Sequence, residues 1–207
     1  MTTWLRLVAA AMLLLLAASC GGILPAPPPA PRLFRLTSLA PAASVGPPIS
    51  LQLVVAAPTA PAAFDTQRVA LARGPNSIDY FADAAWTDQA PLMLQGLIVE
   101  SLKNAGRFRV VALQSAAVRA DVVLTVDLRR FEADYSGAGP PDIRVAFDGL
   151  LVRMPERSVI ATRTFAASAP AAKNETQAIV AAFDAAFHAA MAQMVPWAAD
   201  VLATPAR

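Results

Sequence analysis

The chain has 207 residues, with 17 Lys and Arg, 15 Asp and Glu, one His and one Cys. The near balance of charge, without a basic block or alternating basic and aromatic residues, argues against a nucleic-acid-binding function. Hydrophobic residues make up 56% of the chain, and its length suits one domain with a sizeable core.

The first twenty residues have the pattern of an export leader. Arg6 precedes an apolar run from Leu7 to Ala18, and the small residues before Cys20 resemble a bacterial lipobox, with Ala17 in place of the usual Leu. The run is shorter than the roughly 20 apolar residues that a spanning helix needs. We expect residues 1–19 to be a lipoprotein signal peptide, and an ordinary secretory leader is the alternative.

Cys20 is the expected lipid attachment site. A lone thiol cannot form an internal disulfide, whereas diacylglycerol on its sulfur and a further acyl chain on its amino group would hold the protein in a bilayer. Gly21 follows the cysteine where an inner-membrane retention signal would have Asp, which by analogy favours the periplasmic side of the outer membrane. The inner membrane is the less favoured location.

A proline-rich segment follows the cysteine. Five of the 18 prolines lie between Pro25 and Pro31, where fixed φ angles favour an extended polyproline conformation. We therefore expect residues 20–48 to form a semi-rigid tether and residues 49–207 to form the folded domain.

Alternating apolar and polar residues predict a series of strands. Residues 68–73 and 78–82 flank a turn at Gly74-Pro75-Asn76-Ser77 and predict a hairpin. The other predicted strands cover residues 33–36, 49–55, 108–111, 121–131, 142–153 and 158–167, the last three forming an antiparallel meander.

Two amphipathic helices are predicted. The first begins near Thr87 or Asp88 and ends at Gly106, and the second begins at Asn174 with Gln177 completing a capping box. The apolar stripe of the second helix contains Ile179, Val180, Phe183, Phe187, Met191 and Met194. The expected fold is α+β, a largely antiparallel sheet with two amphipathic helices packed on one face.

The sequence offers little for catalysis. His188 is the single histidine, so there are too few ligands for a typical zinc site, and neither a G-x-S-x-G motif nor a phosphate-binding loop is present. We expect His188 to flank a packed helix. The chain is therefore expected not to be an enzyme and to use no metal and no cofactor beyond the lipid on Cys20.

Two further clusters need an interpretation, and the first of them has two alternatives. Tyr80, Phe81 and Trp86 are either core residues at the junction of a strand and a helix or an exposed anchor for a protein partner. The two arginines at 129 and 130, near two acidic residues at 132 and 134, predict a solvated strand edge.

Several segments in order resemble the ABC-type transport auxiliary lipoproteins, the PqiC-like group. The segments are Arg68 to Asn76, Ile78 to Ala82, Trp86, Leu102 to Phe108, Ala120-Asp121, Phe131 to Tyr135 and Trp197.

This resemblance implies an accessory subunit of an MCE-type ABC transporter, which moves lipids or other hydrophobic molecules across the envelope. The chain would act as a docking component that binds a periplasmic MCE-family protein, while a separate subunit hydrolyses ATP. A periplasmic lipid carrier, with an apolar cavity between helices and sheet, is the alternative. Association of several copies into a homo-oligomer is a further possibility.

Overall fold

The structure is a computed structural model that describes residue 4, residues 30–41, residue 43 and residues 46–204. Apart from residue 4, the predicted signal peptide and the lipid attachment site at Cys20 thus lie outside the described residues. The chain divides into two units, Met1–Ala30 and Pro31–Arg207, and the second is the folded domain.

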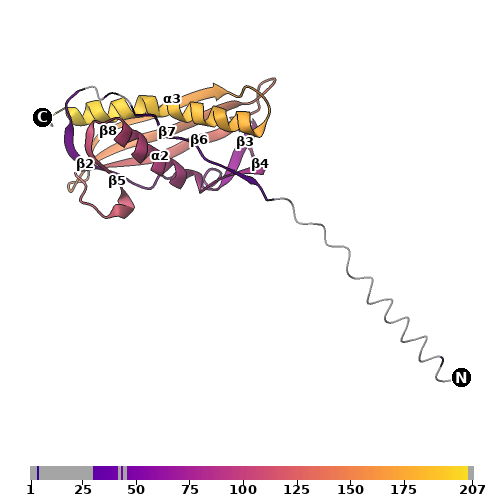
Figure 1. The fold of residues 1–207 in the computed structure, drawn as a ribbon, viewed down its shortest axis with the longest axis horizontal. Helices are drawn as coiled ribbons and strands as arrows, with labels where there is room; N and C mark the ends of the chain where they lie inside the picture. Colours follow the sequence, from indigo (N-terminus) through magenta and orange to yellow (C-terminus); the bar gives the residue numbers. More distant parts are fainter. Residues whose placement is uncertain (1–3, 5–29, 42, 44–45, 205–207) are drawn as a thin grey trace. The chain divides into compact units, whose positions relative to one another are not determined.

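The longest strands of the domain form an antiparallel meander of β6 (Val122–Asp134), β7 (Asp142–Arg153) and β8 (Ser158–Pro170) (Figure 1). Register runs from Val122 opposite Arg153 to Asp134 opposite Asp142, and β8 continues this ladder on the other side of β7. Buried and partly exposed residues alternate along β7, because one face of the sheet lies against the core and the other faces solvent. The predicted meander is confirmed.

The remaining strands extend the sheet to eight strands. β2 (Ile49–Val55) lies parallel to both β6 and β5 (Phe108–Leu113), and β3 (Arg68–Gly74) lies parallel to the other end of β6. The predicted hairpin joins β3 to β4 (Ser77–Trp86), and the short β1 (Arg32–Phe34) pairs in parallel with the end of β4. The long strand pairs of the sheet are therefore antiparallel, whereas most of the short strand pairs are parallel.

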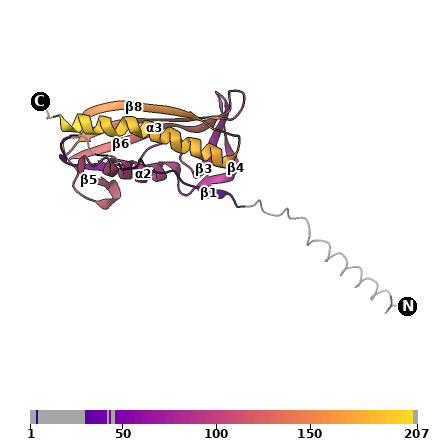
Figure 2. The ribbon, with the colours of Figure 1, turned by 45° about the horizontal axis from the view of Figure 1, so that its top comes forward.

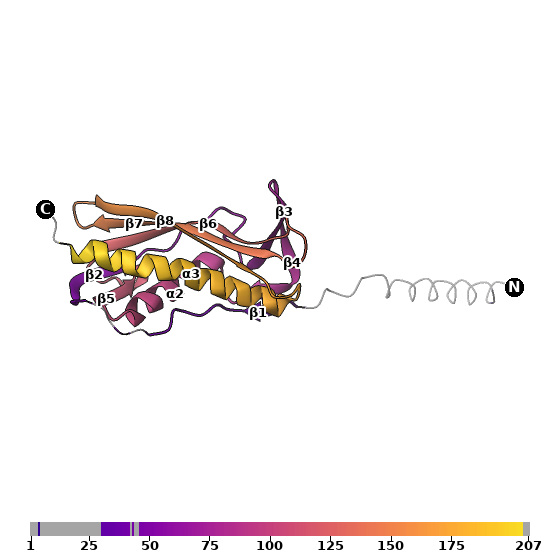
Figure 3. The same cartoon turned by 90° about the horizontal axis from the view of Figure 1, so that it is seen from above.

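Two helices cover one face of the sheet, as predicted. α2 (Ala90–Asn104) packs on β5, and α3 (Thr176–Ala203) runs along β7 and β8, with the two helices side by side in Figure 3. Figure 2 shows the same layer from a second direction, with α3 beside the long strands. A short 3-10 helix, η2 (Gln114–Ala116), follows β5.

The core lies between α3 and the meander. Residues Phe183, Phe187, Met191 and Met194 of the predicted stripe are fully buried. Gly149 on β7 leaves room for this packing, because a Cβ there would lie 3.0 Å from the Phe165 ring and 3.5 Å from Trp197. α3 is long and apolar enough to cross a membrane, but over half of its most apolar window is buried inside the domain, as in a core helix.

The predicted helix caps are wrong at both N-termini. Neither Gln89 before α2 nor Glu175 before α3 makes a side-chain cap hydrogen bond, and the Asn174 amide oxygen instead accepts a bond from Tyr135. The stop at Gly106 is confirmed, with a left-handed φ of 63°. The caps differ because the Asp88 and Asn174 side-chain oxygens accept hydrogen bonds from the Gln89 backbone N–H and the Tyr135 hydroxyl, and the helices begin only at Ala90 and Thr176.

The domain also begins earlier than residue 49, the predicted boundary. Its compact unit starts at Pro31, β1 pairs with β4, and Leu36 is buried in the core. Residues 31–41 of the predicted tether are therefore part of the fold.

Candidate partner-binding surface

Trp86 is a core residue and not an exposed anchor. Its side chain is 0% exposed, and its ring centroid lies 5.3 Å from that of Phe131 and 5.2 Å from that of Phe183. Phe131 and Phe183 are 5.0 Å apart, so the three rings form a closed triangle between sheet and α3. The interpretation of Trp86 as a partner contact is therefore wrong.

Tyr80 and Phe81 remain half-buried on the hairpin, and as neighbours in a strand they point to opposite faces. The Tyr80 hydroxyl donates to the backbone oxygen of Ala63 at 3.3 Å, and the Arg68 guanidinium carbon lies 3.7 Å from the Tyr80 ring centroid. Phe81 lies 6.4 Å from Tyr135, measured between ring centroids. Both aromatic residues therefore have an intramolecular contact on one side and solvent on the other.

The outer edge of the hairpin is open. β1 pairs with only Ala84, Ala85 and Trp86, and no other described strand lies along Ser77 to Asp83 on that side. Ile78, next to the turn, is 39% exposed. An open strand edge presents backbone N–H and C=O groups that can pair with an extended segment of another chain.

A polar groove of about 410 Å³ lies beside the hairpin, on the solvent face of the sheet. Its lining comprises Ala72, Gly74, Pro75, Ser77 and Ile78 from the hairpin with Arg129, Arg130, Glu132, Asp134, Ser136 and Arg144 from β6, β7 and the turn between them. The hairpin thus forms one wall and the charged face of the meander forms the other.

The arginines of this groove are paired with carboxylates. Arg144 Nη2 lies 2.8 Å from Asp134 Oδ2, and Arg130 Nη1 lies 3.8 Å from Glu132 Oε1. Arg129 contacts two further carboxylates on the same face, Asp127 at 3.0 Å and Asp148 at 3.7 Å. The predicted strand edge is wrong, because β6 has partners on both sides and these charges lie on its solvent face.

His188 belongs to a clasp that fixes the segment after β1. The Asp184 carboxylate accepts hydrogen bonds from the Thr37 backbone N–H at 2.7 Å and the Thr37 hydroxyl at 2.8 Å. His188 Nε2 lies 3.0 Å from both the hydroxyl and the backbone oxygen of Thr37. The carboxylate thus binds the threonine directly instead of orienting the imidazole through its other nitrogen, which is unlike a Ser-His-Asp arrangement.

The same segment is also bound to α2. The Leu39 backbone N–H donates to Ser101 Oγ at 3.0 Å, and Asn104 Nδ2 donates to the Leu39 backbone oxygen at 2.7 Å. Residues 37–39 therefore bridge both helices. Sequence analysis missed this set because its partners lie 62 to 151 residues apart in the chain, and no local pattern marks them.

Comparison with known proteins gives the family. The sequence pattern of ABC-type transport auxiliary lipoprotein components matches residues 34–195. The chain belongs to this family. This auxiliary lipoprotein is 33% identical over 163 residues to an uncharacterized protein of Bradyrhizobium diazoefficiens, covering 77% of this chain and 42% of that protein. The chain thus spans less than half the length of that relative.

Two solved structures resemble the auxiliary lipoprotein. A crystal structure of a Xanthomonas campestris protein is 28% identical with a TM-score of 0.77, covering 82% of this chain and 95% of that one. An uncharacterized protein is 16% identical with a TM-score of 0.64, covering 82% of this chain and 99% of that one, which shows the fold alone. The resemblance read from the sequence is therefore confirmed at the level of the family.

Two carboxyl groups in the polar groove of the auxiliary lipoprotein are perturbed in opposite directions. Burial raises the pKa of the Glu132 carboxyl, whose residue is only 7% exposed, although the nearby Arg130 opposes this effect. Hydrogen bonding by Ser136 lowers the pKa of Asp134, and the Arg144 guanidinium adds to this effect. The groove therefore stabilises the charge of Asp134 and disfavours that of Glu132.

We expect Glu132→Gln to stabilise the domain at pH 7 relative to the wild type. Because the folded-state pKa of Glu132 is raised, folding favours the protonated carboxyl. The contribution of Glu132 to the unfolding free energy is therefore highest below pH 4.5, its usual pKa, and is lost as pH rises through the folded-state pKa. The difference in unfolding free energy should shrink toward pH 4, which urea titrations at both pH values measure. Asp134→Asn is the matched control with the opposite sign, destabilising at pH 7 and converging below pH 3.8.

These groups do not assemble a recognisable catalytic centre. Within the described part of the chain, no three His, Cys, Asp or Glu side chains are placed to hold a metal ion. The groove offers ion pairs and hydrogen-bond donors, and the hairpin offers an open strand edge and aromatic side chains. An open strand edge can accept an extended segment of another chain.

Proposed function

We propose that this auxiliary lipoprotein is the acyl-anchored docking subunit of an MCE-type ABC transport system that moves lipids or other hydrophobic molecules across the envelope. Cys20 would carry diacylglycerol and a further acyl chain, and would hold the protein on the periplasmic side of the outer membrane. Family membership supports the role as a lipoprotein auxiliary to ABC-type transport. The MCE partner and the outer membrane are the steps that the proposal adds, and the chain itself would be no enzyme.

The open edge of β4 is the observation that carries the docking proposal. On the side away from β3, Ser77 to Asp83 have no described partner strand, and Ile78 and Tyr80 stand on one face of this edge. An extended segment of the partner could add a strand there, while its side chains would contact the arginines and carboxylates of the polar groove. Such an interface would be specific, because the partner segment must pair with the β4 backbone and also carry charges complementary to those of the groove.

The clasp supports the anchoring half of the proposal. The proline-rich segment leads into a chain that is fixed by Thr37 to α3 and by Leu39 to α2. A pull on the anchor would therefore act on the helical layer and not on a loose loop. This connection suits a protein that is held in place while it binds a partner.

The alternative of a carrier with an interior cavity has less support. The space between α3 and the meander is filled by the fully buried side chains Phe183, Phe187, Met191 and Met194. A lipid placed there would have to displace the core itself. The predicted location of that cavity is therefore not supported by the packing.

A photo-crosslinking amino acid at position 78, introduced into the full-length protein in its native cells, tests the docking proposal. We expect it to capture an MCE or ABC component of the envelope. The matched control is position 118, because Val118 is 42% exposed and Ile78 is 39% exposed, but Val118 lies in the loop before β6. Equal capture from both positions, or no transport component from position 78, would contradict the proposal.

A further inference from the structure

A second groove lies at the end of the domain where α3 terminates. Figure 3 shows that β1 lies at the opposite end of the domain. Its volume is about 720 Å³, which falls within the usual range of about 300 to 1,000 Å³ for small-molecule sites. Its lining comprises Leu51, Arg153, Ser158, Val159, Ile160, Ala161, Val201, Leu202, Ala203 and Thr204.

The walls of this groove are mostly aliphatic. Val159 is 62% exposed at the start of β8, and Ile160 and Val201 are only half-buried around the same space. β8 is an edge strand of the sheet and packs against α3, and the last turn of α3 lines the groove together with the start of β8. Several aliphatic side chains that could be covered by an apolar ligand therefore converge on one site.

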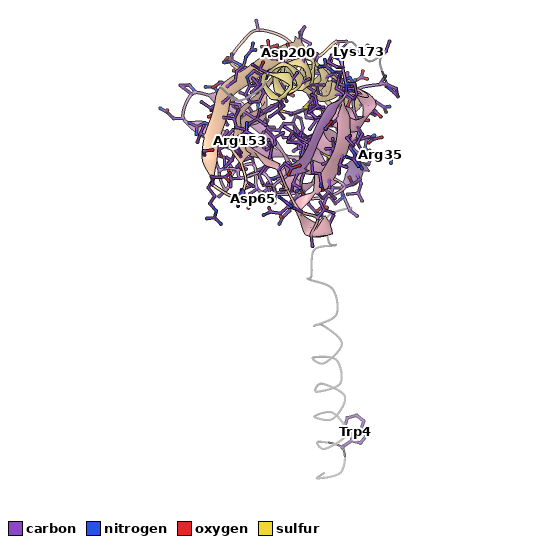
Figure 4. All side chains as sticks on the ribbon, turned by 90° about the vertical axis from the view of Figure 1, so that its left-hand side faces the viewer. Trp4, Arg35, Asp65, Arg153, Lys173 and Asp200 are labelled. Carbon is purple, nitrogen blue, oxygen red and sulfur yellow. The ribbon has the colours of Figure 1, made fainter. Side chains whose placement is uncertain are left out.

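Arg153 is the only ionisable side chain among the described residues of this lining. Among residues 30–41 and 46–204, no carboxylate forms an ion pair with it, whereas Arg129, Arg130 and Arg144 in the polar groove each face a carboxylate. Figure 4 looks at this end of the domain and labels Arg153 on the strand side, below the end of α3. An aliphatic groove with one uncompensated cation matches a ligand that has an apolar chain and one anionic group.

We propose that this groove binds a single-chain anionic amphiphile, with its hydrocarbon chain against Val159, Ile160 and Val201 and its anionic head group on Arg153. The site is separate from the hairpin, so amphiphile binding can be tested independently of the docking proposal. It would give the domain direct contact with an amphiphile at the end away from β1. The volume of the groove fits one such molecule. A stable protein partner would need a larger surface than this groove, because it buries roughly 800 Å² on each side.

Binding of dodecanoate and of its neutral methyl ester to the non-acylated chain Gly21–Arg207 tests this proposal. This chain retains the whole compact unit Pro31–Arg207. We expect Arg153→Gln to weaken dodecanoate binding by about tenfold, because a charge-assisted hydrogen bond is lost, and to leave the methyl ester unaffected. Val159→Asp should weaken both ligands, since it places a charge in the aliphatic wall.

The matched controls are Arg109→Gln on β5 and Val118→Asp in the loop before β6, both on exposed residues outside the lining. They should leave both affinities unchanged, and all variants should keep the wild-type urea unfolding curve. The proposal is overturned if native mass spectrometry finds no dodecanoate on the wild-type chain. It is also overturned if Arg153→Gln affects both ligands equally, or if only a chain ending at Thr204 binds, which would assign the groove to residues 205–207.

Discussion

Cys20→Ser is expected to abolish acylation and leave the chain with an uncut leader. The sulfur is the atom that would accept diacylglycerol, and each buried methylene of an acyl chain contributes about 0.8 kcal/mol to membrane attachment. Mass spectrometry of the purified protein should therefore find residues 1–19 still attached and no acyl mass in the variant. The wild type should begin at position 20 and carry the mass of its lipid.

A second variant separates the lipid from the leader. Exchange of residues 1–20 for a cleavable secretory leader should release the chain from Gly21 onward into the soluble periplasmic fraction, lowering its membrane-bound share by about tenfold or more. The uncut Cys20→Ser chain is the necessary comparison, because its apolar leader can itself hold the protein at a membrane. A wild-type protein without acyl mass, or a leader-exchanged chain that stays with membranes, would contradict lipid anchoring.

Trp86→Ala is expected to destabilise the folded domain by about 3 to 5 kcal/mol. The indole is fully buried and contacts both Phe131 and Phe183, so its removal leaves a large cavity between the sheet and α3. A single domain has a total stability of only about 5 to 15 kcal/mol, so this loss would be a large share of it. Urea unfolding followed by circular dichroism measures the change as a lower midpoint at an unchanged slope.

Trp86→Phe is the control that separates ring packing from the indole N–H. The buried Trp86 Nε1 has no hydrogen-bond partner among the described residues, so replacement with Phe removes an unpaired donor while a ring still fills most of the space. We expect a loss of about 1 kcal/mol or less. If Trp86→Ala cost no more than Trp86→Phe, the aromatic triangle would not be a main element of the core.

The clasp and the two grooves lie in different parts of the domain and have different proposed roles. Thr37 and Leu39 fix the incoming chain to the helices, the hairpin edge and its polar groove face a proposed protein partner, and the groove at the end of α3 is proposed for an amphiphile. Arg130 and Arg153 illustrate the difference between the grooves. Arg130 faces Glu132, whereas Arg153 has no described carboxylate partner and leaves a positive charge for a ligand.

The sequence alone determined the local elements of the domain. Alternation of apolar and polar residues placed the strands that became β2, β6 and β7, because a strand with one buried face has a period of two. The helical spacing of Phe183, Phe187 and Met191 placed the buried face of α3 for the equivalent reason. Seven short segments spread along the chain were also sufficient to indicate the family.

Tertiary structure alone decided which of these residues are available to a partner. Trp86 and Tyr80 look alike in the sequence, yet β1 and α3 enclose the first while the second lies on a hairpin with an open edge. The clasp of Thr37, Asp184 and His188, the parallel strand pairs and the isolated Arg153 likewise depend on segments distant in the chain. Local patterns record which side of an element is apolar, but burial, charge pairing and exposure depend on which elements pack together.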